Sequence, residues 1–326
     1  MNSWGQIFRV TIWGESHGKQ VGVSIDGVPA GIALCEEDFS ADLDRRRAGS
    51  LGTTPRKESD LPHIVSGLYN GYTTGSPLTI EFLNENTLSG DYRNLVKHPR
   101  PSHADLVAQQ KWNGYNDPRG GGHFSGRITL GLVAAGVVAK KILGSGVEFS
   151  TEITEIGGTQ DKAKFNEVLE AAQAQRDSIG GVVECRVSGI EAGLGEPFFD
   201  SVESQIAHIV FAVPAVKGVE FGKGFEAARM LGSEHNDMII SKEGATATNN
   251  AGGIVGGITN GNEIVVRAAI KPTASIAREQ ETYNFESNSV ETLVIKGRHD
   301  VCIALRAAVV VEAAVAIALA DLKLRA

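Results

Sequence analysis

The chain has 326 residues, of which 42% are hydrophobic and 21% are charged, as in an ordinary soluble globular protein. Its formal net charge of −8 argues against a general nucleic-acid-binding protein and against a protein that binds anionic membranes through charge. The length would allow two domains, but one large α/β or α+β domain is equally compatible.

Cysteine usage and the apolar segments indicate the compartment. The three cysteines are an odd number without paired metal-ligand spacing, so we expect no disulfide framework, no metal site and a reducing cytosol. The first 14 residues lack the charged-then-apolar layout of a signal peptide. The most apolar run, 301–319, is interrupted by Arg306 and Glu312, which favours a buried core helix over a membrane span. We therefore expect a cytoplasmic protein that does not bind a membrane.

The first part of the chain is typical of short strands separated by turns. The patterns predict strands at 8–12 and 20–25, a helix at 36–47, a polar loop at 50–60, two strands within 65–83 and an irregular segment at 84–97. Ser16 and His17 follow the first strand and lie between glycines. At the end of a strand, such side chains can project into a cleft.

Three consecutive arginines, Arg45, Arg46 and Arg47, end the predicted helix. Cations in a last helical turn complement the helix dipole, which explains one or two of them. Three in a row exceed what a helix end needs, so an anion-binding role is an equal alternative. The polar loop 50–60 that follows is mobile in character and could close over such a site.

The stretch 98–143 organises the chain. It begins with histidines and arginines between prolines, passes through the three glycines 120–122 and enters a predicted apolar helix at 128–143. Consecutive glycines let a backbone approach a ligand closely, and a helix start offers free N–H groups to an anion. The glycines alone would fit an ordinary surface loop, but histidines and arginines crowded around them predict a binding site.

The second part of the chain repeats this mixture of elements. The patterns predict strands at 147–156, 182–190 and 263–271, an edge strand at 219–225, a surface helix at 161–175, an amphipathic helix at 201–211, and a last helix after residue 300. A second glycine cluster lies at 252–257.

Segments of the two halves match one another in the same order. Segment 25–32 resembles 187–194, segment 67–75 resembles 253–261 in its glycines and threonine, and Arg127 with 132–135 resembles Arg306 with 311–314. The shared order predicts an internal duplication. Each half would contribute antiparallel strands and one helix that is apolar all round and must be covered on every side.

This duplication predicts the architecture. We expect an α+β protein with a β-α-β sandwich, in which two antiparallel sheets enclose a helical layer with pseudo-two-fold symmetry. The predicted single domain spans 1–326, with pseudo-repeats at about 1–145 and 146–326. The two glycine-led helix starts, 120–127 and 297–306, should face one cleft between the halves.

Several motifs together resemble the chorismate synthase family. They are GESHG at 14–18, IDGVPAGI at 25–32, DLDRRR at 42–47, RPSHAD at 100–105, RGGG at 119–122, AVKGVEFG at 215–222, AGGIVGGI at 251–258, KPT at 271–273 and GRHD at 297–300. The resemblance covers almost the whole chain. It implies a carbon–oxygen lyase acting on a phosphate, at the last step of the shikimate pathway to aromatic amino acids.

The resemblance also implies the reaction, the cofactor and the assembly. The enzyme would eliminate phosphate in a 1,4 sense from 5-enolpyruvylshikimate 3-phosphate to give chorismate. Reduced FMN would be required without net redox change, with NADPH as a candidate reductant of the flavin. The family is usually a homotetramer and binds no nucleic acid.

Residue roles follow from matching the family motifs. His17 would protonate the departing phosphate, His103 would assist proton movement at the flavin, and Asp300 would relay the proton lost from the substrate. Implied substrate-binding residues are Ser16, Arg46, Arg100 and Arg127. Implied cofactor-binding residues are His123, Phe124, Ser125, Pro214, Ala215, Gly256, Lys271, Pro272, Thr273, Ala274, Ser275 and Arg298.

Two positions depart from the family pattern. His123 stands where an arginine commonly follows the triple glycine, so a phosphate contact would be weakened or taken over by a protonated imidazole. Gly52 stands where many members have an arginine linked to nicotinamide binding or to the substrate lid. Neither position is one of the implied proton-transfer residues.

Two other functions fit part of the pattern. An anion-binding module without chemistry explains the arginines and glycines, but it gives His17, His103 and Asp300 no common purpose, and it should not perturb added flavin. A flavin oxidoreductase would consume NAD(P)H in proportion to product, which the elimination would not do.

Overall fold

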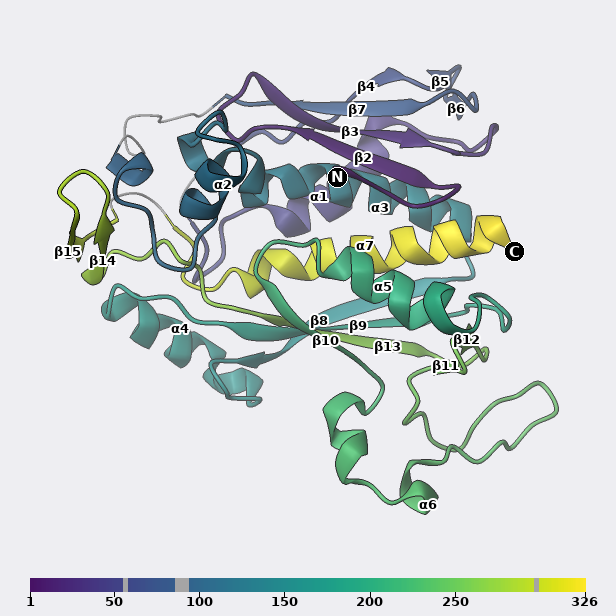
Figure 1. Cartoon of the computed structure of the whole chain (residues 1–326). Helices are drawn as coiled ribbons and strands as arrows, with labels where there is room; N and C mark the ends of the chain where they lie inside the picture. Colours follow the sequence, from purple (N-terminus) through teal and green to yellow (C-terminus); the bar gives the residue numbers. More distant parts are fainter. Residues whose placement is uncertain (55–57, 86–93, 296–298) are drawn as a thin grey trace.

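The computed structural model describes residues 1–54, 58–85, 94–295 and 299–326. It forms three layers, with a helical layer between two antiparallel sheets (Figure 1). The α+β sandwich predicted from the duplication is therefore confirmed. None of the helices within these ranges is long and apolar enough to cross a membrane.

Each half of the chain supplies one sheet. The first has the strand order β1-β2-β3-β7-β4 and consists of β1 (Ser3–Trp4), β2 (Arg9–Gly14), β3 (Gln20–Asp26), β4 (His63–Ser66) and β7 (Leu78–Leu83). The second has the order β10-β13-β9-β8 and consists of β8 (Glu148–Ile156), β9 (Gly181–Ser188), β10 (Val216–Phe221) and β13 (Ile264–Ile270). Alternate side chains of β7 and β13 are buried against the helices, as the period of two in a strand requires.

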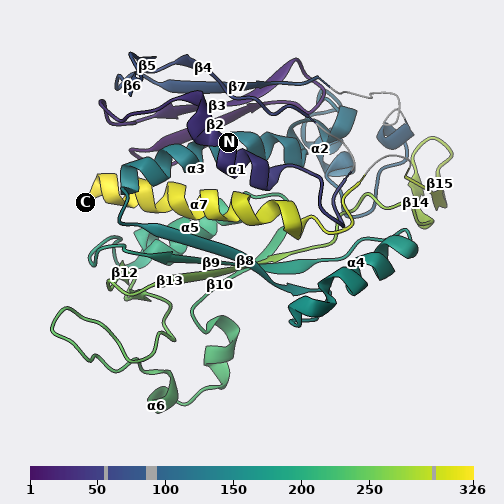
Figure 2. The same ribbon diagram turned by 180° about the vertical axis from the view of Figure 1, so that it is seen from behind.

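The helical layer explains why the longest helices are apolar all round. It contains α1 (Ser40–Arg46), α3 (Thr129–Leu143), α5 (Val202–Val210) and α7 (Ala304–Arg325). α1 lies against α3 and α7, as the view from behind shows (Figure 2). A Cβ atom on Gly136 of α3 would lie 2.5 Å from the Cβ of Ala313 of α7, so only glycine lets these two helices come so close.

Smaller elements lie outside the sandwich. They are α2 (Asp105–Lys111), α4 (Phe165–Ala174), α6 (Gly232–His235) and the hairpins β5–β6 (Leu68–Tyr69, Tyr72–Thr73), β11–β12 (Ile254–Val255, Ile258–Thr259) and β14–β15 (Gln280–Asn284, Ser289–Leu293). Figure 1 shows α6 and the neighbouring loops projecting below the second sheet. The sequence patterns missed α2 and the hairpin β14–β15.

Several predicted boundaries need correction. The expected helix at 36–47 is a 3₁₀ turn (Glu36–Phe39) followed by α1, and the surface helix expected from 161 begins as α4 at Phe165. The edge strand predicted at 219–225 is β10, which starts earlier and gives way to a 3₁₀ turn at Gly224–Arg229. Between β4 and β7 the chain forms the extra hairpin β5–β6.

The duplication is visible in the hydrogen bonds of two equivalent threonines. Thr73 Oγ1 accepts from the backbone N–H of Ile32 (2.9 Å) and donates to the carbonyl of Pro29 (2.7 Å). Thr259 Oγ1 accepts from the backbone N–H of Leu194 (2.9 Å) and donates to the carbonyl of Glu191 (2.7 Å). Both threonines are buried, at 4% and 3% exposure. These positions match in the sequence alignment of the halves, so the same hairpin anchors each sheet.

Candidate active site

A cavity of about 540 Å³ lies where α3 and α7 begin, at the same end of the helical layer. Its lining comes from both halves of the chain, because Gly120, Ser125 and Arg127 precede α3 whereas Asp300 and Arg306 flank the start of α7. The structure thus brings the two matching helix starts to one cleft, as the duplication predicts; Gly297 itself is outside the described residues. A volume of this size suits a small-molecule ligand.

Most residues implied by the family motifs line this cavity. They are Ser16, Arg46, Arg100, His103, Phe124, Ser125, Arg127, Pro214, Ala215, Lys271, Pro272, Thr273, Ala274, Ser275 and Asp300. The lining also includes Arg47, Lys271 and Arg306 as cations and Glu58, Asp60 and Asp300 as acids. Among the described residues that line the cavity, arginines and lysines therefore outnumber aspartates and glutamates.

Three implied residues lie elsewhere, and a fourth cannot be placed because it is not among the described residues. The His123 ring lies between the Gly14 carbonyl (2.8 Å from Nδ1) and Asn2 Oδ1 (3.2 Å from Nε2), and it does not line the cavity. Gly256 is in the turn between β11 and β12, also outside the lining. Arg298 falls outside the described residues. The third, His17, lies immediately behind the cavity wall.

The three glycines make room for histidine rings. All three have positive φ, at 61°, 82° and 54° for Gly120, Gly121 and Gly122. A Cβ on Gly120 would lie 2.6 Å from Nε2 of His17, so any other residue would displace this ring. A Cβ on Gly121 would be nearest to His103, at 3.7 Å from its Cε1 and Nε2. The backbone turn therefore passes against both histidines.

Ser16 is a buried polar group that faces the cavity without a partner. Its side chain is in a residue with 1% exposure, and its Oγ has no hydrogen-bond partner among the described residues. Buried hydroxyl groups in folded proteins are normally paired. An unpaired one in a cavity wall is what a site for a polar ligand requires.

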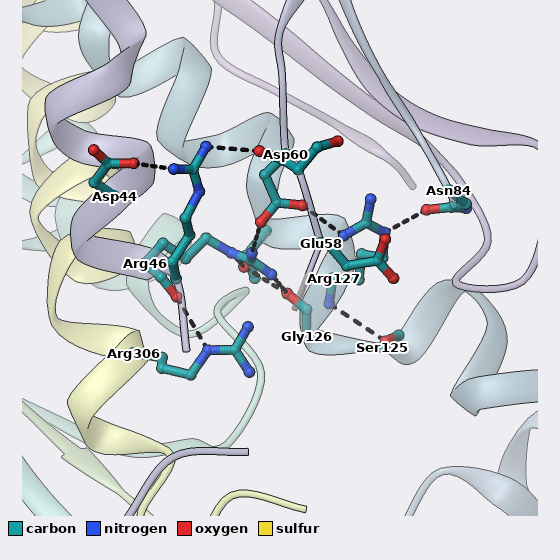
Figure 3. A network of polar contacts seen from close by, with 12 residues as sticks. Asp44, Arg46, Glu58, Asp60, Asn84, Ser125, Gly126, Arg127 and Arg306 are labelled. Carbon is teal, nitrogen blue, oxygen red and sulfur yellow. Dashed lines mark hydrogen bonds and ion pairs between the residues drawn. The ribbon is translucent and has the colours of Figure 1, made fainter. Parts of the chain in front are cut away.

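Two arginines share one carboxylate on another wall. Asp60 lies between Arg46 and Arg127 (Figure 3), with its Oδ1 2.7 Å from Nη1 of Arg127 and its Oδ2 3.4 Å from Nη1 of Arg46. Arg46 also donates to Thr129 Oγ1 (3.0 Å) and to the Gly126 carbonyl (2.9 Å). These bonds hold both guanidinium groups rigidly at the start of α3.

Arg127 makes two further contacts with the end of β7. It donates to the Leu83 carbonyl (2.9 Å) and, through Nε, to the side-chain oxygen of Asn84. The arginine thereby joins the first sheet to the loop that carries Asp60.

A third arginine reaches this group from α7. Nε of Arg306 donates to the backbone carbonyl of Arg46 (3.0 Å), and its Nη1 lies 3.1 Å from Oδ2 of Asp300. The other oxygen of Asp300 accepts from the backbone N–H of Thr54 (2.9 Å). Asp300 is thus held from two sides, by a cation and by the polar loop.

The neighbouring cations affect the pKa of Arg46. Burial, together with the nearby charges of Arg306 and Arg127, lowers the pKa of its guanidinium to about 9, although Asp60 and Asp300 oppose this shift. A depressed pKa of a cation means that its charged form is destabilised where it lies. An anionic ligand would relieve this repulsion.

The opposite wall carries His103 and the segment 271–275. Nζ of Lys271 donates to the Ser102 carbonyl (3.1 Å), and its pKa is lowered by burial and by Lys217. Arg100 donates to Ser275 Oγ (2.7 Å). These contacts fasten the segment after β13 to the turn before α2.

The structure adds residues that the motifs did not assign. Asp60, Arg306, Thr54 and Glu58 all line the cavity. Arg306 had a signal in the sequence, since it matches Arg127 in the alignment of the halves. Asp60 had none beyond its place at the end of a polar loop.

Gly52 occupies a position where a side chain would not fit. Its φ is +83°, and a Cβ would lie 3.0 Å from Leu169 and 3.1 Å from Leu305. Its carbonyl accepts from the backbone N–H groups of Val301 (2.8 Å) and Cys302 (3.1 Å). In this chain the position anchors the polar loop beside Asp300.

Comparisons with known proteins agree on one family. A family model described as chorismate synthase matches residues 8–324. The chain is 61% identical to a chorismate synthase of Chitinophaga pinensis, with 99% of this chain and 97% of that protein covered. It is 44% identical to one of Dehalococcoides mccartyi, with 100% and 97% covered. A crystal structure of chorismate synthase matches with a TM-score of 0.74 and 28% identity, covering 99% of this chain and 93% of the other.

Proposed function

The chain belongs to the chorismate synthase family, and we propose that it converts 5-enolpyruvylshikimate 3-phosphate to chorismate and phosphate, in a 1,4-elimination that requires reduced FMN. The observation that carries this proposal is a cavity in which His103 and arginines of the family motifs meet around a surplus of cations, with His17 directly behind its wall. The substrate bears a phosphate and two carboxylates. Guanidinium forks are the side chains best suited to such groups.

Substrate binding falls to the arginine group. Arg46, Arg127 and Arg306 lie together at the helix starts, and their only described carboxylate partners there are Asp60 and Asp300. We assign the phosphate or a carboxylate of the substrate to this wall. Ser16, whose hydroxyl is unpaired, would donate to the same ligand.

The residues of the cavity also suit a flavin. Apolar side chains, among them Val213, Pro214, Ile303 and Val310, face the polar and cationic walls, which fits a flat aromatic ring system joined to a phosphate. Phe124, Ser125 and the segment 271–275 would hold it. Bound reduced FMN would supply the electron density that assists departure of phosphate, and it would regain it, so that no net redox change occurs.

Three groups would move protons. His17, behind Gly120, would protonate the leaving phosphate, and an imidazole is suited to this because it titrates near neutrality. Asp300 would take up the proton that the substrate carbon loses, from a position fixed by Arg306 and by the N–H of Thr54. His103 would assist at the flavin. Closure of the cavity would exclude water and strengthen each of these contacts.

The decisive experiment is anaerobic phosphate release from 5-enolpyruvylshikimate 3-phosphate, with and without dithionite-reduced FMN. We expect release only with reduced FMN, and chorismate in equal amount. The variants H17A and D300N should fold normally and lose most turnover, whereas H63A, in the exposed strand β4, should retain it. No release by folded, flavin-bound protein would contradict the proposal.

The same assay separates the alternatives. A flavin oxidoreductase would consume NADPH in proportion to product, and an anion-binding module would leave the flavin spectrum unchanged. NADPH added with oxidised FMN tests whether the protein reduces its own flavin.

We also propose that the protein forms a homotetramer in the cytoplasm, as family members usually do. Large apolar side chains exposed around α6, namely Phe225, Leu231, Met238 and Ile239, support a contact with another copy of the chain. Light scattering coupled to size exclusion measures the mass, and a monomeric mass at micromolar concentration would contradict this assembly.

A further inference from the structure

Asp105 connects two residues of the active site. It is the first residue of α2, and its side chain is 7% exposed. The turn before it, with Ser102 at a φ of 56°, brings the chain back so that Asp105 faces both Arg100 and His103. The proposed reaction requires no step of Asp105 itself.

The contacts of its carboxylate are unusually complete. Oδ2 accepts from Nε of Arg100 (2.7 Å) and from the backbone N–H of Arg100 (3.1 Å), and Oδ1 accepts from Nη2 of Arg100 (2.7 Å). Oδ1 also lies 2.7 Å from Nδ1 of His103. Burial alone would raise the pKa of Asp105, but the hydrogen bonds from Arg100 and His103 outweigh it and hold that pKa well below its usual range. The carboxylate is therefore ionised at any working pH.

An ionised carboxylate at this distance decides which nitrogen of His103 carries the proton. Nη2 of Arg100 (3.1 Å) and the backbone N–H of Asp105 (3.2 Å) also approach Nδ1, and these donors would favour an unprotonated Nδ1. The contact to Oδ1 is shorter and bears a full negative charge, so it is the stronger one. Nδ1 then donates to Asp105, and Nε2, which lies beside Gly121, is left as the unprotonated nitrogen.

The same carboxylate holds the guanidinium group of Arg100 in place. Nε and Nη2 bond to Asp105, and Nη1 donates to Ser275 Oγ at 2.7 Å. Its side chain is 4% exposed. Arg100 thus bridges Asp105 and the segment 271–275, and it also lines the cavity in which the family motifs assign it to the substrate.

We propose that Asp105 is a positioning residue of this active site, which fixes the tautomer and the orientation of the His103 ring and holds Arg100 against Ser275. The expected effect of Asp105 on turnover rests on the proposed function of His103. The expected effect on the His103 ring does not depend on that function. Among the described residues, the charged groups next to His103 on its own segment are Arg100 and Asp105. Lys271 comes near because it donates to the carbonyl of Ser102, and Asp117 lines a small second cavity together with His103.

The test compares D105N with D105E and with D200N. Asp200 pairs with Arg325 at the far end of α7 and serves as a matched control. Nitrogen NMR of ¹⁵N-histidine-labelled full-length protein reports the His103 tautomer without any ligand. In the wild type and in D200N we expect a proton on Nδ1 of neutral His103. In D105N the Nδ1 tautomer should no longer dominate, because the carboxylate that accepts from Nδ1 is lost.

Turnover with reduced FMN gives the second readout. We expect kcat of D105N to fall about 100-fold or more, which is a larger change than in KM. D105E keeps the charge and should recover much of this loss. It also keeps the test valid if D105N does not fold.

The outcomes separate the two proposals. If the tautomer of His103 is the same in folded D105N and in the wild type, Asp105 does not position this ring and the inference is wrong. If the ring changes as expected but turnover does not, Asp105 positions His103 as inferred, and the assigned role of His103 in the proposed reaction is wrong.

Discussion

Two neighbouring arginines of α1 belong to opposite kinds of ionic cluster. Arg45 points into the helical layer, where it pairs with Glu312 at 2.7 Å and with Asp42 at 3.0 Å. Lys140 also pairs with Asp42, at 2.6 Å. Two cations there meet two carboxylates. Arg46 points into the cavity, where it, Arg127 and Arg306 meet only Asp60 and Asp300 among the described residues.

The difference in charge balance distinguishes the cluster that serves the fold from the cluster that serves function. In the balanced cluster, burial would raise the pKa of Glu312, yet Arg45 and Lys140 lower it to about 2, and Glu312 raises the pKa of Arg45 in return. In the cavity, burial and the neighbouring cations Arg306 and Arg127 lower the pKa of Arg46. A closed cluster stabilises the fold by itself, whereas a cluster with a surplus cation is completed by an anionic ligand.

The largest expected effect comes from Arg46→Ala. Removal of a buried guanidinium that faces an anion costs about 4 kcal/mol of binding in the transition state, so we expect kcat/KM to fall about 1,000-fold. Steady-state kinetics with reduced FMN measures this change. The matched control is R45A, which should lower the melting temperature while leaving kcat/KM of the folded protein nearly unchanged; the reverse pattern would contradict the comparison.

Glu312→Gln should produce the largest loss of stability. It leaves Arg45 and Lys140 without their buried carboxylate, which we expect to lower the free energy of unfolding by about 2–4 kcal/mol. Urea denaturation at neutral pH measures this difference. An unchanged midpoint would show that the balanced cluster adds nothing to stability.

The pH dependence of that loss has a defined sign. Since the pKa of Glu312 is lowered in the folded state, its contribution is complete above the ordinary value of 4.5 and disappears as the pH falls toward about 2. The stability difference between the wild type and E312Q should therefore shrink across this window. A difference that stays constant between pH 5 and 2.5, measured by urea denaturation, would contradict the lowered pKa.

Asp60→Asn should have a smaller effect that depends on anions. Loss of this carboxylate leaves Arg46 and Arg127 without their shared partner, so we expect the ligand-free protein to lose about 1–3 kcal/mol. Inorganic phosphate should then raise the melting temperature of D60N more than that of the wild type. D42N, which removes a carboxylate from the balanced cluster, should also lose stability but should not gain this response to phosphate.

Arg47→Ala should have the smallest effect of the three arginine substitutions. Its guanidinium pairs with Asp44 and donates to the Ser59 carbonyl at 2.6 Å, and its side chain is 39% exposed. Partly exposed ion pairs contribute between about 0 and 1 kcal/mol, so the melting temperature should barely change. A loss in kcat/KM as large as that of R46A would place Arg47 in the binding group instead.

The sequence pattern predicted the layers because the local period of apolar residues shows which sides of a strand or helix are buried. Alternation in β3 marks a half-buried strand. The apolar circumference of α3 and α7 requires cover on all sides, which two sheets supply. The patterns missed α2 and the hairpin β14–β15. Both are short and lie against the outside of the sandwich, where long-range contacts rather than periodicity define the element.

The sequence by itself determined the sandwich, its internal duplication and the family, since each is encoded in repeated spacings and in motifs that can be read along the chain. Only the tertiary structure decided that Arg45 closes a structural cluster and Arg46 enters the cavity, that the His123 ring lies away from it, and that Asp60 and Arg306 belong to it. The reason is physical. The direction of a side chain at a helix end, and the partner it meets from a distant segment, depend on how the layers pack, and no local pattern records that packing.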